Sequence, residues 1–200
     1  MGRMGKTVLA IALVLLAGPA LAQGSQGSDG ESFLKAVRDD DVAKAMPLVQ
    51  SQGRQIVNYR GYDGDTALHV ATRKRALDWM GFLLGKGADP NIADRQGDTP
   101  LIAAARIGFE EGVKTYVAVG ANVDAGNRRG ETALIVAVQQ RQPRIVELLL
   151  RAGASPDKAD FAAGYTARDY AKRDSRSKEL IRLIETVKST RRKAAGPSLN

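Results

Sequence analysis

Apolar residues recur along residues 31–189 with the three- and four-residue spacing of amphipathic helices, in pairs of short segments separated by polar loops. In the central pairs the first segment has a leucine followed three residues later by an alanine, as in Leu68 and Ala71. The second segments span 77–84, 113–117 and 145–150. This spacing places the apolar side chains on one face of each helix, so the pattern predicts paired helices that pack closely through small residues.

Each pair of predicted helices is bounded by residues that start and stop helices. Threonines precede the first segments, at Thr66, Thr99, Thr132 and Thr166, and glycines follow the second segments, at Gly87, Gly120 and Gly153. A threonine hydroxyl there accepts a hydrogen bond from a free backbone N–H, and glycine adopts the left-handed conformation that ends a helix. The loops between them are rich in Asp, Asn, Pro and Gly, which favours extended hairpins, called fingers below.

These units repeat every 33 residues. The glycine of a Gly-x-Thr motif stands at 64, 97 and 130, and again at 164 after one extra residue. The motifs Gly64-Asp65-Thr66-Ala67-Leu68 and Gly97-Asp98-Thr99-Pro100-Leu101, together with this period, resemble the ankyrin repeat over residues 31 to about 189. A unit of this size cannot bury its apolar face alone, so its stability must come from stacking on its neighbours.

The resemblance implies an all-α fold: an α-solenoid of stacked ankyrin repeats with β-hairpin fingers and atypical capping units at both ends. We expect a Gly/Ser-rich linker at 23–30, an N-terminal capping unit at 31–60, repeats at 61–93, 94–126 and 127–159, a C-terminal capping unit at 160–189, and a basic disordered tail at 190–200. The run Asp39-Asp40-Asp41 is predicted to be a solvated turn in the first unit; a cation site is the alternative, although the glycine and final glutamate of a calcium loop are absent.

His69 is the single histidine of the chain. In ankyrin repeats the histidine at this position hydrogen-bonds between repeats, and Ile102, Ile135 and Asp169 replace it in the other units. The resemblance therefore implies a structural His69 and a thin polar network between repeats. A role as a ligand or in proton transfer is the alternative, which a lone imidazole favours less because no second His or Cys can share a metal with it.

Residues 1–22 have the three parts of a secretory signal peptide. Arg3 and Lys6 precede the apolar run 8–17, and Ala20-Leu21-Ala22 predicts cleavage between Ala22 and Gln23. The apolar run is too short to remain across a bilayer, which needs about 20 residues. The signal has a bacterial form, so we expect the mature chain in the periplasm, with secretion as the alternative; a buried N-terminal helix is the competing interpretation of these residues.

Composition and motifs give no support for catalysis. The chain has no cysteine, which excludes disulfides, thiol nucleophiles and zinc sites built on cysteine. We found no glycine-rich phosphate loop, nucleophile elbow or His-Glu-x-x-His helix in the sequence. We therefore expect no catalytic residue, no cofactor and no metal ion.

The positive charge of the chain lies at its C-terminal end. The net charge of +8 falls to +6 without Arg3 and Lys6, and residues 168–200 alone carry +6, so the array before them is neutral. This basic segment predicts either attachment to an anionic envelope polymer or membrane surface, or simply a solvated, solubilising end. Nucleic acid is not expected as a partner in the predicted compartment.

In ankyrin proteins, partners usually bind the concave face made of finger tips and first helices. The corresponding positions here are Tyr62, Asp63, Asp65, Arg73, Lys74, Arg95, Gln96, Asp98, Arg106, Ile107, Arg128, Arg129, Glu131, Gln139, Gln140 and Phe161. Aromatic residues and arginine dominate interface energies, so the expected anchors are Tyr62, Arg95, Arg128, Arg129 and Phe161. The alternative is that the finger tips are merely solvated.

The resemblance thus implies a monomeric, non-enzymatic, exported module that binds a protein partner, in stress defence or toxin neutralisation. A rival hypothesis is an adaptor held at the cell envelope by its basic C-terminal segment.

Overall fold

The computed structural model describes residues 23–174 and 176–187, which form eleven helices and no regular strand. The helices are α1 (Gln23–Asp39), α2 (Val42–Gln52), α3 (Arg54–Val57), α4 (Ala67–Arg73), α5 (Leu77–Gly85), α6 (Pro100–Arg106), α7 (Glu110–Ala118), α8 (Ala133–Gln139), α9 (Pro143–Arg151), α10 (Ala167–Arg173) and α11 (Lys178–Thr186). None of them is long and apolar enough to cross a membrane. The predicted signal segment 1–22 and basic tail 190–200 lie outside the described residues.

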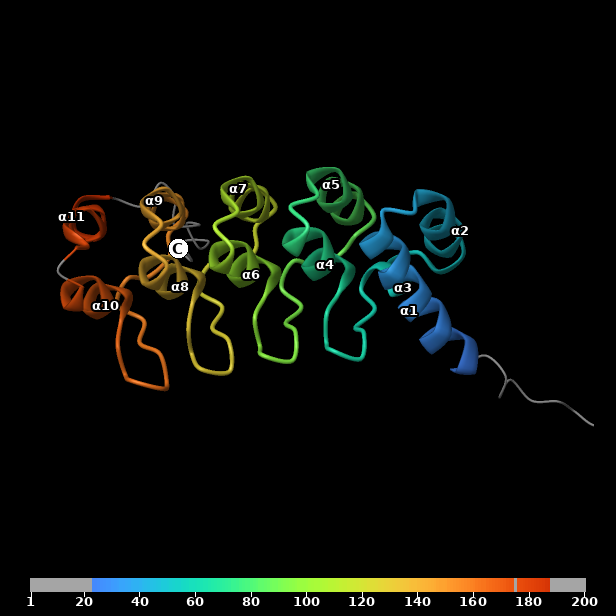
Figure 1. The fold of residues 1–200 in the computed structure, drawn as a ribbon, viewed down its shortest axis with the longest axis horizontal. Helices are drawn as coiled ribbons and strands as arrows, with labels where there is room; N and C mark the ends of the chain where they lie inside the picture. Colours follow the sequence, from blue (N-terminus) through green and yellow to red (C-terminus); the bar gives the residue numbers. More distant parts are fainter. Residues whose placement is uncertain (1–22, 175, 188–200) are drawn as a thin grey trace, which may run out of the picture.

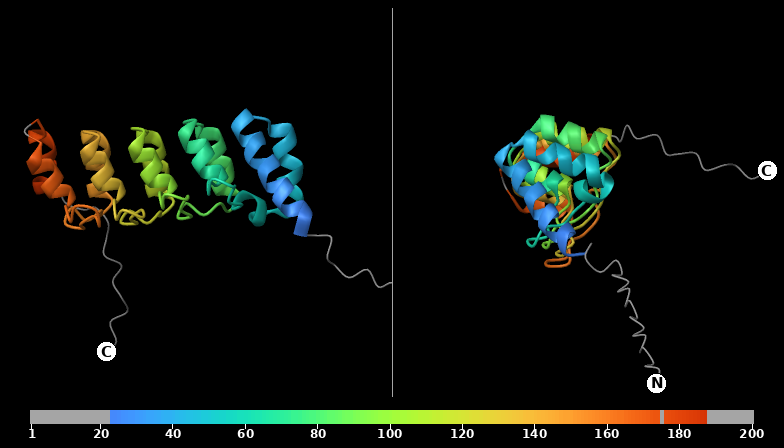
Figure 2. Two further views of the ribbon diagram at one scale, coloured as in Figure 1. Left: turned by 60° about the horizontal axis from the view of Figure 1, so that its bottom comes forward. Right: turned by 90° about the vertical axis from the view of Figure 1, so that its right-hand side faces the viewer.

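The helices stack in two rows (Figure 1). In the inner row α1 contacts α4, and the contacts continue in order through α6, α8 and α10; in the outer row α7, α9 and α11 follow one another. Loops 58–66, 86–99, 119–132 and 152–166 project from one side of the stack as the fingers (Figures 1 and 2). The predicted all-α array of stacked helix pairs is therefore confirmed.

Local sequence signals account for where the helices begin and end. The hydroxyl of Thr99 accepts a hydrogen bond from the backbone N–H of Ile102 at 3.3 Å, and Thr132 caps α8 in the same way. Thr66 and Thr166 form capping boxes at the starts of α4 and α10. Because these caps satisfy N–H groups that a helix leaves unpaired, each seven-residue inner helix starts at the predicted threonine.

One continuous apolar core runs along the array. The leucine of each central inner helix is at most 1% exposed, at Leu68, Leu101 and Leu134, and the alanine three positions later is fully buried, at Ala71, Ala104 and Ala137. Each small alanine lets neighbouring inner helices approach closely, so the core is shared between repeats rather than enclosed within one.

The predicted linker at 23–30 is wrong, since these residues form the first turns of α1. Glycine and serine have low helix propensity, which favoured a linker. Contacts at the end of this stretch oppose that preference: Asp29 accepts a hydrogen bond from the Gln52 amide at 2.8 Å, and Gly30 is buried against the ring of Tyr59. A Cβ on Gly30 would lie 2.5 Å from that ring. Glycine thus allows α1 to pack as the inner helix of the N-terminal capping unit.

The fingers contain less backbone pairing than the predicted β-hairpins. Within the described residues only two isolated antiparallel bridges occur, Gly126 with Thr132 and Ala159 with Thr166. At the tip of the second finger, the backbone N–H of Asp94 donates to the Asp98 carbonyl at 2.9 Å, across the turn that contains Arg95 and Gln96. The Asp94 carboxylate accepts the N–H groups inside the loop, including that of Asp98 at 2.9 Å. These side-chain hydrogen bonds replace the series of backbone hydrogen bonds that a longer hairpin would form.

The expectation of a thin polar network between repeats is also wrong. Asn58 accepts a hydrogen bond from the N–H of Asp89 at 2.7 Å, across 31 residues. The same bond joins Asn91 to Asn122 at 2.8 Å, and it recurs from Ser155 N to the Asp124 carboxylate at 2.8 Å. The acceptors follow the 33-residue period, so each repeat is tied to the next by a polar side chain in the loop rather than by the helical histidine.

Candidate functional site

The finger tips and the inner helices α4, α6, α8 and α10 form one face of the molecule, called the finger face here (Figure 1). Gly97 and Gly130 stand just after two tips with φ of 83° and 77°. A Cβ on Gly97 would lie 2.6 Å from the backbone N of Arg128, and one on Gly130 would lie 2.8 Å from that of Phe161. Only glycine allows both the conformation and this approach, which brings Arg128 N within 3.0 Å of the Gln96 carbonyl.

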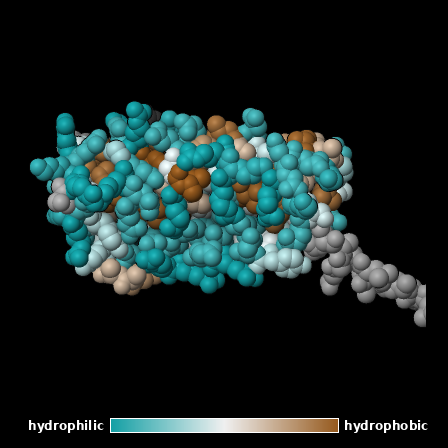
Figure 3. All heavy atoms as spheres, in the orientation of Figure 1, coloured by the Kyte–Doolittle hydropathy of each residue, from teal (hydrophilic) through white to brown (hydrophobic). Residues whose placement is uncertain are grey.

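Large side chains at the tips are left in solvent. Tyr62 is 75% exposed and Phe161 is 79% exposed, at opposite ends of the row of fingers. Arg95 and Arg128 have no ion pair or side-chain hydrogen bond with any described residue. The finger side is mainly hydrophilic, with a more apolar spot at the tip of the last finger (Figure 3). The fold does not use these side chains, so they are available to a partner.

Behind the tips, buried carboxylates hold arginines from the ends of the inner helices. Asp98 is 6% exposed and binds the guanidinium of Arg106 through both oxygens, at 2.7 to 2.9 Å. Asp65 pairs with Arg73 in the preceding repeat with the same eight-residue separation. Each arginine is held in one orientation by its partner, with two-fifths of its side chain or more still exposed. These are fixed guanidinium groups rather than mobile surface charges.

The third repeat breaks this pattern. Glu131 is 3% exposed, and Gln139 takes the place of the arginine eight residues later. The Asn127 amide donates to Glu131 at 3.0 Å, and Arg129 approaches it to 3.3 Å. Arg106 of the neighbouring repeat lies 4.0 Å away. The negative charge of Glu131 is thus compensated by Arg129 and Arg106, and not by an arginine eight residues later in its own repeat.

The predicted site residues therefore fall into two groups. Tyr62, Asp63, Arg73, Lys74, Arg95, Gln96, Arg106, Arg128, Arg129, Gln139, Gln140 and Phe161 are exposed on the finger face. The prediction that Asp65, Asp98 and Glu131 lie on the binding surface is wrong, since all three are buried and position arginines or backbone groups. Ile107 is half-buried against the core. Burial divides the predicted residues into those that a partner can touch on this face and those that it cannot.

His69 joins two repeats from within the core. Its Nδ1 lies 3.2 Å from the backbone N and 3.0 Å from the hydroxyl of Thr66, and its Nε2 lies 2.9 Å from the Asp98 carbonyl. The ring is fully buried, and this burial lowers the pKa of His69 below its ordinary value. Nδ1 accepts from the Thr66 N–H and Nε2 donates to the carbonyl, which a neutral imidazole can do. The predicted structural role of His69 is confirmed.

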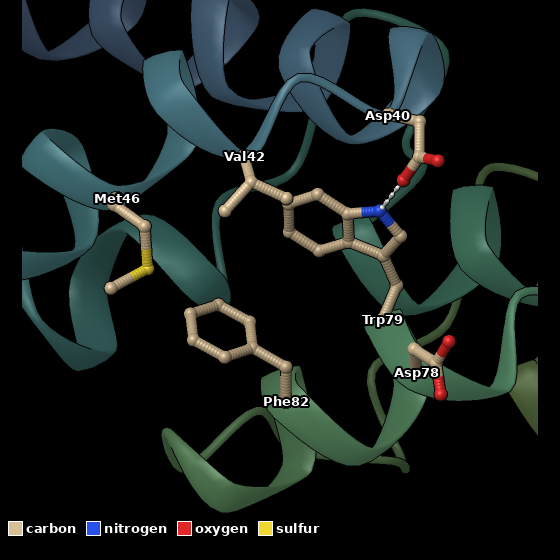
Figure 4. Close-up of a pocket in the computed structure, with 6 residues that line it drawn as sticks. All are labelled: Asp40, Val42, Met46, Asp78, Trp79 and Phe82. Carbon is tan, nitrogen blue, oxygen red and sulfur yellow. Dashed lines mark hydrogen bonds between the residues drawn. The ribbon is translucent and has the colours of Figure 1, made fainter.

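An apolar pocket of about 310 Å³ lies between α2 and α5, at the N-terminal capping unit (Figure 4). Trp79 and Phe82 form its aromatic walls, packed edge to face at 5.7 Å. The Trp79 indole N–H donates to the carboxylate of Asp40. Asp40 therefore has a structural contact that its place in a predicted solvated turn did not indicate.

The other two carboxylates of that turn have separate partners. Asp39 pairs with Lys35, and Asp41 caps α2 by accepting the N–H of Lys44 at 3.0 Å. In the part of the chain that the structure describes, no three His, Asp or Glu side chains are grouped closely enough to hold a metal ion.

Sequence reasoning missed several exposed cations of the finger face. Arg60 in the first finger and Arg173 at the end of the inner helix α10 are both exposed. Arg173 occupies the position that Arg73 and Arg106 hold in their helices, eight residues after the residue that precedes the N-cap threonine. That spacing was the available signal, but the last unit was treated as a cap, and only Phe161 was taken from it.

Comparison with known families agrees with this geometry. A family model described as "Ankyrin repeats (3 copies)" matches residues 80–160, and another described as "Ankyrin repeats (many copies)" matches residues 49–104. The two matches together run from α2 into the last finger, loop 152–166. No curated protein matches the chain. With its 33-residue period, its stacked helix pairs and these matches, the chain belongs to the ankyrin repeat proteins, whose repeats serve as protein–protein interaction modules.

Proposed function

We propose that this protein is a non-enzymatic, exported module that binds a protein partner through its finger face. One observation carries the proposal: two aromatic side chains and a row of arginines stand exposed on the face that ankyrin proteins use for binding, and among them only Arg129 pairs with another described side chain. Tyr62 and Phe161 mark the ends of this row, and Arg95, Arg128 and Arg129 lie between them. Such residues contribute most to binding when a partner removes them from water.

A rigid array suits this kind of recognition. Backbone hydrogen bonds between fingers, such as Phe161 N to Arg129 O at 2.7 Å, and buried ion pairs behind them hold the tips in fixed positions. Less conformational entropy is then lost when a partner binds. The partner contributes its own shape and charge, and the array need not change its fold.

The test is photo-crosslinking with matched charge reversals. A photo-reactive amino acid replaces Tyr62 in the full chain, expressed in its own host, and crosslinked proteins are identified by mass spectrometry. Arg95→Glu, Arg128→Glu and Arg129→Glu are then combined in this chain. We expect the triple variant to remain helical, because Asn127 and Arg106 still face Glu131 when Arg129 is lost. We expect it to lose a specific crosslinked protein by at least about tenfold, because charge reversal at an interface adds repulsion as well as removing attraction.

The control reverses an equal charge on the outer helices, by Lys114→Glu, Arg144→Glu and Lys178→Glu, all at exposed positions. Retention of the crosslinked protein by this control supports the finger face as the binding surface. Equal retention by the finger-face variant would move the binding site elsewhere.

We further propose export to the periplasm, supported by the form of residues 1–22, with stress defence or toxin neutralisation as the process served. Intact mass spectrometry of the protein from fractionated cells tests export: a periplasmic species beginning at Gln23 is expected, and an uncleaved cytoplasmic chain would contradict it. The envelope-adaptor hypothesis depends on residues 190–200. Deleting them abolishes envelope association if that hypothesis is right, while leaving partner binding intact.

A further inference from the structure

On the finger face most of the positively charged side chains are exposed and most of the negatively charged ones are buried. Its fingers and inner helices comprise residues 60–74, 93–107, 126–140 and 160–173, where nine lysines and arginines are exposed. Among the acids of these segments only Asp63 is exposed, and the buried ones are Asp65, Asp94, Asp98, Glu131 and Asp160. Seven of these cations lie before residue 168, in the part of the array that is neutral by residue count, so even this part presents positive charge to whatever approaches the face.

The ion pairs of the inner-helix arginines indicate which chemical group these cations bind. Arg106 already holds a carboxylate through two nitrogens, in the paired geometry that an arginine offers to planar acids. Arg73 holds the equivalent carboxylate of Asp65 one repeat earlier. We call this series of equivalent arginines at the ends of the inner helices the arginine ladder, and each of its positions a rung. The rungs at Arg73 and Arg106 both hold a carboxylate.

The last rung lacks its carboxylate. Arg173 stands at the same helical position in α10, but the residue eight positions before it is Tyr165 instead of an acid. The guanidinium lies over the Tyr165 ring at 4.6 Å and donates to its hydroxyl at 3.0 Å. Arg173 forms no ion pair with any residue in the described ranges. It is held in place as its counterparts are, with its charge uncompensated.

Space for an incoming group lies beside this arginine. A cavity of about 390 Å³ opens between α8 and α10, and its lining includes Arg173, Gln139, Tyr170, Arg141 and Asp174. Gln139 is shorter than the arginine of the other repeats. Among the lining residues, the Gln139 amide is hydrogen-bonded to Tyr170, and the Arg173 guanidinium carries N–H donors that no acid among the described residues satisfies.

The acids near this cavity have donors of their own. Asp174 accepts hydrogen bonds from the backbone N–H of Arg176 at 3.1 Å and from the Arg141 side chain at 2.5 Å, and these bonds lower its pKa to about 2. Burial opposes ionisation of Asp160, but hydrogen bonds from the Tyr170 hydroxyl and from backbone N–H groups outweigh it and lower its pKa. Both carboxylates are therefore engaged, and neither is paired with Arg173.

We propose that the finger face binds an acidic segment of a protein partner, and that Arg173 receives one of its carboxylates in the cavity between α8 and α10. The proposal rests on the proposed function and names the chemistry of the partner. A carboxylate is favoured over a lipid or nucleic-acid phosphate because two rungs of the same ladder already hold carboxylates, and because the aromatic tips Tyr62 and Phe161 suit the side chains of a polypeptide.

The probe is a fluorescein-labelled peptide of alternating glutamate and glycine, titrated with the full chain and followed by fluorescence anisotropy at low salt. Arg173→Gln is expected to weaken binding about tenfold, the usual effect of removing a charged hydrogen-bond donor. Arg144→Gln, which removes an equal charge from the exposed surface of α9, is expected to change it less than about twofold.

A second variant keeps Arg173 and fills its empty rung. Tyr165→Glu places a carboxylate where Asp65 and Asp98 hold their arginines, so it is expected to pair with Arg173 and to weaken peptide binding as strongly as Arg173→Gln. Circular dichroism checks that both variants remain helical. Loss of binding in both variants with retention in Arg144→Gln supports the proposal.

Three results would overturn it. These are equal weakening by Arg173→Gln and Arg144→Gln, undiminished binding by Tyr165→Glu, or tighter binding to phosphatidylglycerol vesicles or to single-stranded DNA than to the peptide. The proposed function is tested separately. If the crosslinked partner is lost in the Arg95, Arg128 and Arg129 reversal but is still captured equally well by Arg173→Gln, finger-face binding stands and the acidic-segment proposal falls.

Discussion

At the scale of single residues, His69 illustrates how one side chain serves two neighbours. Its two ring nitrogens lie within hydrogen-bond distance of Thr66 in its own repeat and of the Asp98 carbonyl in the next. Both contacts are buried, so removing the ring leaves the Thr66 N–H without its acceptor, whereas the Asp98 carbonyl keeps the hydrogen bond from the Asp94 N–H. A buried group without its partner costs about 1–3 kcal/mol, which makes this histidine a structural bridge despite its titratable ring.

This arrangement predicts a pH-dependent stability. Burial lowers the pKa of His69 below its ordinary value of 6.5, so the unfolded chain binds the proton more readily than the folded chain. The contribution of the neutral ring is complete above about pH 6.5 and is lost as the pH falls through 6.5 toward the lower folded pKa. We expect the free energy of unfolding, measured in urea, to fall more between pH 7.5 and 5.5 for the natural chain than for His69→Gln. Parallel pH profiles would contradict this.

At the scale of elements, local signals were predictable from their spacing, whereas apart from that of His69 the polar contacts between repeats were not. The caps at Thr99 and Thr132 depend on residues three positions away, so their sequence spacing was sufficient. Asn58 binds a backbone group 31 residues away, and Gly30 packs on a ring from another element, so neither role appears in any local pattern. The candidate site divides in the same way: its face follows from the repeat, whereas the burial of Asp98 depends on a neighbouring finger.

The fingers give a prediction with an internal control. Gly97→Ala places a Cβ 2.6 Å from the Arg128 backbone at a φ of 83°, so it is expected to destabilise the fold by at least about 1 kcal/mol. Gly81→Ala lies inside α5 with no atom within 4 Å of its new Cβ, and it is expected to stabilise the fold by about 0.5–1 kcal/mol. Urea unfolding of both variants measures the difference. Equal stabilities would show that close finger stacking is not required.

At the scale of the whole molecule, the array is a line of units in which each inner helix contacts only its neighbours. α6 lies between α4 and α8, and the core continues through all three. The free energy of such an array is approximately the sum of the intrinsic terms of its repeats and the terms of their interfaces. A defect in a central repeat therefore weakens the interfaces on both sides, and its effect reaches residues that do not touch it.

Leu101→Ala tests this coupling, because Leu101 is 1% exposed at the centre of the array. The cavity is expected to cost about 2–5 kcal/mol, whereas Leu77→Ala, at a position 43% exposed, is expected to cost less than about 1 kcal/mol. Trp79 is the single tryptophan and lies in the preceding repeat, so its fluorescence reports on a neighbour while circular dichroism reports on all helices. We expect both signals of Leu101→Ala to shift to the same lower urea concentration. If circular dichroism shifted while the Trp79 transition stayed at its original midpoint, the repeats would be unfolding independently and the interfaces would not be the source of stability.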